Sequence, residues 1–252
     1  MHLRKLKMLF PIILTLSLAH AQEIRTGEDV LRGMHDHYAK TWYETLTFTQ
    51  KSTTYKADGT SSSETWHEAL KVPGKLRIDI GNPSDGNGYL MVDGTLTIVK
   101  DNKVAGTRPL VNMALVLGFD VYRQTPETTA SVIKGEGYDL TKVHEDTWEG
   151  QPVYVVGAAK GDLKAKQFWV DKRNWLFVRM FEPTQSDATK FQDIRFEDYR
   201  QMAGGWVAAR VDLYVEDKKV FGEEYSDIQC NAKLAPGTFD ATQFSSTHWE
   251  KP

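Results

Sequence analysis

The feature of this sequence that most restricts its fold is an alternation of apolar and polar side chains in two blocks, residues 45–100 and 138–229. At the start of the first block, Leu46 and Phe48 alternate with threonines, and the same rhythm returns after residue 138. Successive side chains of a β-strand point to opposite faces, so the alternation is typical of strands with one buried face. We therefore expect a chain built mainly of antiparallel strands.

Short turn signals divide the two blocks into strands of ordinary length. Asp93-Gly94 sits between two alternating runs, which predicts a tight hairpin, and Pro73-Gly74, Glu149-Gly150 and Gly204-Gly205 mark further turns. The expected strands are 45–55, 64–72, 75–80, 89–92, 95–100, 138–146, 152–158, 164–171, 175–182, 190–200, 206–215 and 219–229.

Three segments have helical character. Thr26, with Asp29 three residues on, is a candidate N-cap for an amphipathic helix over residues 27–43. A nearly uncharged helix is expected from Pro109 to Gly118, because proline is favoured at the first helical position. A third, short helix is expected over residues 126–134. The order is therefore one helix, five or six strands, a helical insert and about six more strands.

This order predicts the fold class α+β, mainly β, with about 11 strands. An antiparallel sheet of that size must curl to bury one face. The helices are then expected to cover the concave face.

The N-terminus has the pattern of a secretory signal peptide. Three basic residues precede an apolar run from Met8 to Leu18, and Ala19-His20-Ala21 fits the small-x-small cleavage pattern. The run of about 11 residues is too short for a helix that spans the ~30 Å hydrocarbon core. We expect cleavage before Gln22, which leaves residues 22–252 as a single domain. No cysteine follows the cleavage site, so we expect a soluble protein without a lipid anchor.

Charge and motifs argue against several classes of function. The net charge is −3, whereas nucleic-acid binding favours a basic surface. The sequence has no nucleophile elbow, no zinc-protease motif, no paired cysteines and no glycine-rich phosphate loop. His35 and His37 point to different sides of a helix, and the acid pair Glu223/Glu224 faces opposite sides of a strand. We expect no metal, no cofactor and no enzymatic activity.

Several local phrases, in their order along the chain, carry a family resemblance. They are Phe48-Thr49-Gln50-Lys51, Val72-Pro73-Gly74-Lys75-Leu76-Arg77-Ile78, Val92-Asp93-Gly94-Thr95-Leu96, Trp169-Val170-Asp171 with Leu176, Phe191-Gln192-Asp193, Phe196-Glu197-Asp198-Tyr199 and Phe239-Asp240. Together they resemble the bacterial lipoprotein-carrier family (LolA and LolB) and the related outer-membrane lipoprotein-sorting proteins. The resemblance covers nearly all of residues 26–244.

The resemblance implies an incomplete, half-open antiparallel β-barrel whose apolar concave face is lidded by helices and binds acyl chains. It implies a periplasmic location, a lipid or acylated lipoprotein as ligand, and possible inner-membrane donor and outer-membrane acceptor proteins as partners. The chain departs from the family in having Val72 where the carrier has an arginine that ties the lid closed. It also lacks the protruding apolar loop and the lipid anchor of LolB-type acceptors.

Within such a fold, alternation predicts which side chains line an apolar cavity, and Met113 and Leu117 of the helix at 109–119 are expected to join them. The predicted ligand-binding residues are Leu46, Phe48, Trp66, Leu70, Leu76, Ile78, Met91, Leu96, Met113, Leu117, Phe168, Val170, Ile194, Phe196, Val211 and Leu213. The helix itself is either a mobile lid or a fixed part of the core.

The expected function is a carrier that binds lipid or lipoprotein acyl chains and moves them toward the outer membrane. Burying a sixteen-carbon chain would contribute roughly 12 kcal/mol at about 0.8 kcal/mol per methylene, so release needs a lid that can replace the ligand. The alternatives are an envelope sensor or interaction module on the same scaffold and, less favoured, an enzyme.

Overall fold

The computed structural model describes residues 23–184 and 186–246, so the expected signal peptide lies outside the described residues. Within them, thirteen strands form one antiparallel sheet in the order β6-β5-β4-β3-β2-β1-β13-β12-β11-β10-β9-β8-β7. The strands are β1 (Thr45–Tyr55), β2 (Ser61–Lys71), β3 (Lys75–Ile80), β4 (Gly88–Val92), β5 (Thr95–Lys100), β6 (Lys103–Pro109), β7 (Val143–Trp148), β8 (Gln151–Val156), β9 (Gln167–Asp171), β10 (Phe177–Pro183), β11 (Phe191–Met202), β12 (Gly205–Val215) and β13 (Lys218–Cys230).

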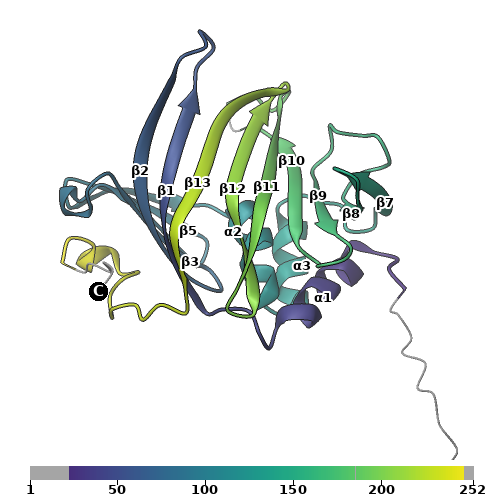
Figure 1. Cartoon of the computed structure of the whole chain (residues 1–252), viewed down its shortest axis with the longest axis horizontal. Helices are drawn as coiled ribbons and strands as arrows, with labels where there is room; N and C mark the ends of the chain where they lie inside the picture. Colours follow the sequence, from purple (N-terminus) through teal and green to yellow (C-terminus); the bar gives the residue numbers. More distant parts are fainter. Residues whose placement is uncertain (1–22, 185, 247–252) are drawn as a thin grey trace, which may run out of the picture.

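The sheet is curled and open, because its two edge strands, β6 and β7, do not pair with each other (Figure 1). Strands that are neighbours in the sheet are also consecutive in the chain, except at the centre, where β1 pairs with β13. The fold class expected from the sequence, α+β and mainly β, is confirmed.

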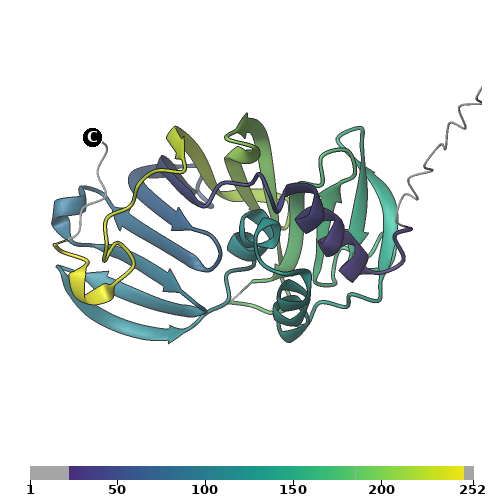
Figure 2. The same cartoon turned by 90° about the horizontal axis from the view of Figure 1, so that it is seen from below.

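The helices lie on one face of the sheet. They are α1 (Gly27–Tyr38), α2 (Met113–Gly118) and α3 (Pro126–Gly135). The chain also has three short 3-10 turns among the described residues, η1 (Pro83–Asp85), η2 (Asp120–Tyr122) and η3 (Ala241–Gln243). Figure 2 views the molecule from below and shows α1, α2 and α3 in front of the middle of the sheet and its green half, whereas none of these three helices lies in front of the blue strands β2 to β6. We call the face with the helices the inner face.

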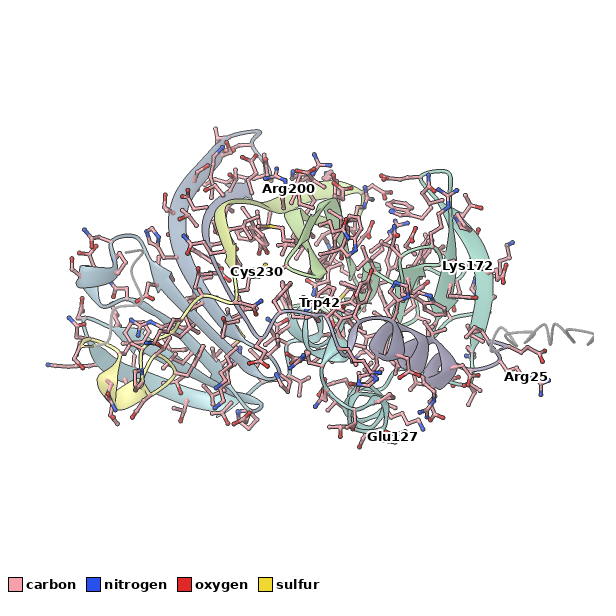
Figure 3. The ribbon with its side chains drawn as sticks, turned by 60° about the horizontal axis from the view of Figure 1, so that its bottom comes forward. Arg25, Trp42, Glu127, Lys172, Arg200 and Cys230 are labelled. Carbon is pink, nitrogen blue, oxygen red and sulfur yellow. The ribbon has the colours of Figure 1, made fainter. Side chains whose placement is uncertain are left out.

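The aromatic residues between the helices and the sheet fill the middle of the molecule. Trp42 stacks on Tyr122 with ring centroids 3.8 Å apart, and Tyr38 meets Tyr122 edge-on at 5.4 Å. Figure 3 places Trp42 centrally, with Glu127 and Lys172 toward the periphery. This part of the inner face is therefore a filled core.

Two helix boundaries differ from those expected. The capping box of Thr26 and Asp29 is present, but α1 ends at Tyr38 and not at residue 43. Trp42 continues the apolar spacing because it packs into the same core from the turn that leads into β1. The second helix begins at Met113, because the Asn112 side chain accepts the Leu115 N–H at 3.2 Å and caps it there.

Two strand expectations also need correction. Pro109 ends strand β6, on the edge of the sheet, where proline is tolerated because no neighbouring strand needs its missing N–H. Strand β6 was not expected, since its residues are largely exposed and do not alternate. The strand expected from Tyr138 starts only at Val143, because Asp139 accepts the Thr141 N–H in a turn.

The C-terminal segment covers the outer face of β3. Arg77 is fully buried there, pairs with Asp79 at 2.7 Å, and donates to the Phe244 carbonyl at 2.9 Å. Its guanidinium also lies 4.1 Å from the centroid of the Phe244 ring. A buried ion pair therefore holds residues 238–244 against the sheet.

Candidate functional site

A cavity of about 260 Å³ lies between the inner face of the sheet and helix α2. Its walls come from strands β1 to β4 and β11 to β13, which are consecutive in the sheet and include its centre (Figure 2). Ten of the predicted residues share this lining: Phe48, Trp66, Leu70, Leu76, Ile78, Met91, Ile194, Phe196, Val211 and Leu213.

Six predicted residues are buried but do not line this cavity. They are Leu46, Leu96, Met113, Leu117, Phe168 and Val170. Five of them belong to the main core, and Leu96 is buried on β5 opposite Met91. Side chains of the helices and of the segments that connect them fill the space over part of the inner face. Tyr138, which follows α3, is an example, because its ring centroid lies 6.2 Å from that of Phe168. Inner-face position alone therefore does not decide which residues border open space.

The cavity also has polar walls that were not among the predicted residues. Gln50, Glu68, Asn112, Glu223 and Tyr225 all line it. The signal that could have found two of them is the same alternation, because Glu68 lies between Trp66 and Leu70 on β2 and Gln50 follows Phe48 on β1. Further apolar lining comes from Tyr89, Ala114, Leu115, Phe119 and Phe221.

Strand register explains how these polar residues reach one cavity. Glu68 pairs with Phe48 of β1 on one side and with Ile78 of β3 on the other. Directly opposed residues of neighbouring strands share a face, so Glu68 stands within an apolar row. Glu223 of β13 likewise pairs with Val211 of β12. Its neighbour Glu224 is exposed, as expected for adjacent residues of a strand.

The two cavity carboxyl groups are held in surroundings that disfavour their charge. Glu68 is 5% exposed, and no hydrogen bond joins its side chain to another described residue. Burial raises the pKa of Glu68 well above its usual range, and the charge of Glu223 raises it further. For Glu223, burial raises the pKa to about 7, although its carboxylate accepts the Tyr225 hydroxyl at 2.5 Å, which acts in the opposite direction.

Helix α2 forms the roof of this cavity and has open space on two sides. Ala114, Leu115 and Phe119 line the first cavity, and a second cavity of about 320 Å³ lies against the same helix. Leu115 and Asn112 border both spaces. The end of the helix is close to the sheet, since a Cβ on Gly118 would stand 2.8 Å from the Phe196 ring. The helix is therefore packed closely against the sheet at its C-terminal end and borders open space near its start, although Met113 is buried.

A hydrogen bond connects the segment after α2 to the β2–β3 turn. Asp120, which is 4% exposed, accepts the N–H of Gly74 at 3.0 Å. Burial raises the pKa of Asp120 to about 7, and the nearby charge of Asp93 raises it as well. Val72, which precedes this turn, is buried in the main core. Asp120 thus supplies a side-chain contact between this turn and the helical insert.

Stability is expected to fall as pH rises from about 4.5 to about 7. Asp120 and Glu223 keep their protons in the folded state to about pH 7, whereas the unfolded chain releases them near 3.8 and 4.5. The unfolded state therefore binds fewer protons in this window, and the loss, about 3–4 kcal/mol per group, is complete near pH 7. Carboxyl groups with a lowered pKa, such as Asp58, affect the stability only at pH values below this range.

Urea unfolding at pH 5 and pH 8 checks this expectation. The Glu223→Gln variant should lose less stability between the two pH values than the wild type, and Glu224→Gln should behave like the wild type. Wild-type stability that is equal or greater at pH 8 would contradict the assignment of the buried carboxyl groups.

The described part of the chain offers neither a metal cluster nor a membrane-spanning helix. Residues 23–184 and 186–246 contain no group of three or more histidine, cysteine or acidic side chains arranged to hold a metal ion. In the same residues, no helix combines the length and the apolar character needed to cross a membrane.

Solved structures with the same arrangement provide the comparison. A DUF1329 family protein from Desulfovibrio piger superposes with a TM-score of 0.55 at 12% identity, covering 85% of this chain and 95% of the other. A LolA superfamily protein from Nitrosomonas europaea gives 0.53 at 14% identity, covering 83% and 96%. An outer-membrane lipoprotein-sorting protein domain from Vibrio parahaemolyticus gives 0.54 at 15%, covering 87% and 98%. The fold is LolA-like.

The likeness concerns the LolA-like fold and not the sequence. No family model matches this chain, and no curated protein matches it. At identities of 12–15%, the cavity residues have to be interpreted from their own chemistry.

Proposed function

We propose that this protein is a periplasmic carrier that holds the acyl chain of a lipid or lipoprotein in the cavity beneath α2 and carries it toward the outer membrane. The observation that supports this most is the cavity itself, a space of about 260 Å³ with mostly apolar walls between α2 and the inner face of a LolA-like sheet. Ligand cavities in proteins are typically concave and mostly apolar, with a few polar groups that orient the ligand.

The roof of the cavity offers a route for entry and release. The start of α2 borders open space on both sides, and the segment after it is connected to the β2–β3 turn through Asp120 and Gly74. In this proposal, α2 moves as a lid when an acyl chain enters, and its own side chains Leu115 and Phe119 partly fill the cavity when the chain leaves. Residues 1–21 act as the cleaved export signal, and membrane-associated donor and acceptor proteins are the expected partners.

Titration with an uncharged dye tests the binding step. N-phenyl-1-naphthylamine fluoresces in apolar surroundings, and residues 22–252 should bind it saturably with a stoichiometry near one. Dodecyl maltoside below its micelle concentration should displace the dye, because both compete for the same apolar walls. A protein that binds neither compound would contradict the carrier proposal and favour an interaction module.

A further inference from the structure

The side chains of the cavity wall that can carry a charge near neutral pH are all acidic. Two carboxyl groups, Glu68 and Glu223, line it, and no lysine, arginine or histidine is among the described residues of the lining. A headgroup with a negative charge would meet like charges there without a compensating cation, which is unfavourable in a poorly solvated site.

Glu68 has an unused capacity for interaction. It is only 5% exposed, it borders the cavity, and it makes no hydrogen bond to another described residue. Unpaired carboxyl groups are costly to bury, so such a position calls for a partner from the occupant of the cavity. Burial is the main cause of the raised pKa values of Glu68 and Glu223, and a cation bound beside the two groups would lower both values.

Aromatic rings stand next to both carboxyl groups. Phe48, the cross-strand partner of Glu68, stacks on Tyr225 with centroids 4.2 Å apart. Trp66 and Phe221, two positions from Glu68 and Glu223, have centroids 6.0 Å apart. Faces of aromatic rings attract cations, and ring clusters with carboxylates are a recurring means of binding ammonium groups.

We infer that the cavity selects amphiphiles whose head is an ammonium cation, held by Glu68 and Glu223 among the aromatic rings, with the alkyl chain along the apolar inner face. This inference rests on the proposed function and adds the charge of the headgroup. The ammonium group supplies the positive charge that the cavity walls lack. The apolar residues Ile78, Ile194 and Val211 provide the surface for the chain.

Binding of matched twelve-carbon compounds to residues 22–252 tests the inference at pH 8. Dodecyltrimethylammonium, dodecylamine, dodecanoate and dodecyl maltoside are compared below their micelle concentrations by calorimetry. Both cations should bind at least about tenfold more tightly than dodecanoate. Preference for the trimethylated head would assign most of the selectivity to the rings, and preference for the primary amine would assign it to the carboxylates.

Variants separate charge recognition from chain binding. Glu68→Gln and Glu223→Gln should each reduce the preference for cations over dodecanoate by about threefold or more and leave dodecyl maltoside affinity nearly unchanged. Glu224→Gln, on the exposed side of the same strand, should leave all four affinities unchanged.

The outcomes distinguish the two levels of the proposal. If no compound binds, the carrier proposal itself fails. If dodecyl maltoside binds and wild-type protein takes dodecanoate as tightly as the two cations, the ammonium inference is overturned while the carrier proposal stands. The wild-type comparison alone decides this, even if a glutamine variant does not fold.

Discussion

Ala114→Trp is expected to lose at least about thirtyfold in affinity for dodecyl maltoside while retaining the fold. Ala114 lies on α2, is partly exposed and lines the cavity, so a larger side chain can enter the open space. Excluding two or three methylene groups of a ligand would cost about 2 kcal/mol, which corresponds to about thirtyfold in affinity. The dye titration described above measures the change.

Ala114→Ser serves as the matched control. It keeps the small side chain at the same position, so its affinity should stay within about twofold of wild type. Circular dichroism and urea unfolding establish that both variants are folded. Unchanged binding by a folded Ala114→Trp protein would mean that ligands do not occupy the space beneath α2.

Arg77→Met is expected to lower the free energy of unfolding by about 3–5 kcal/mol. The substitution removes the guanidinium that pairs with Asp79 at 2.7 Å in a fully buried position and leaves that carboxylate without its cation. It also removes the donor to the Phe244 carbonyl and the contact with the Phe244 ring. Urea unfolding followed by tryptophan fluorescence gives the change directly.

Two comparisons test the cause of that loss. The double variant Arg77→Met/Asp79→Leu should be less destabilised than Arg77→Met alone, because no buried carboxylate remains. Lys134→Met removes a partner from the exposed pair with Glu28 and should cost no more than about 1 kcal/mol. A loss below about 1 kcal/mol for Arg77→Met would show that the buried pair does not hold the C-terminal segment in place.

The alternation of side chains predicted most of the sheet because the buried inner face makes it visible. Leu46 and Phe48 show this on β1, where both are buried as expected. Strand β6 could not be found in this way, since it is an exposed edge strand without a buried face. The start of α2 was misplaced because Pro109 fits both a helix start and an edge-strand end, and only the capping bond of Asn112 decides between them.

The position of the cavity could be predicted only in part. Alternation places Phe168 and Phe196 on the same inner face, yet only Phe196 borders open space, because the helical layer fills the region next to Phe168. Which inner-face residues border open space depends on where the helices pack, and the alternation within the strands carries no information about helix packing. The sequence shows Glu223 only beside Glu224, whereas its contact with Tyr225 and its place in the cavity follow from the pairing of the strands.

The most direct test of the carrier proposal is mass spectrometry of the protein expressed with its own N-terminus in a bacterial envelope. The protein is purified without detergent, its mature N-terminus is read, and bound molecules are extracted into organic solvent. The proposal predicts a chain that begins near Gln22 and carries about one acyl-chain molecule per protein, with Ala114→Trp nearly empty. A wild-type protein without bound lipid that also fails to take up the uncharged dye would contradict it.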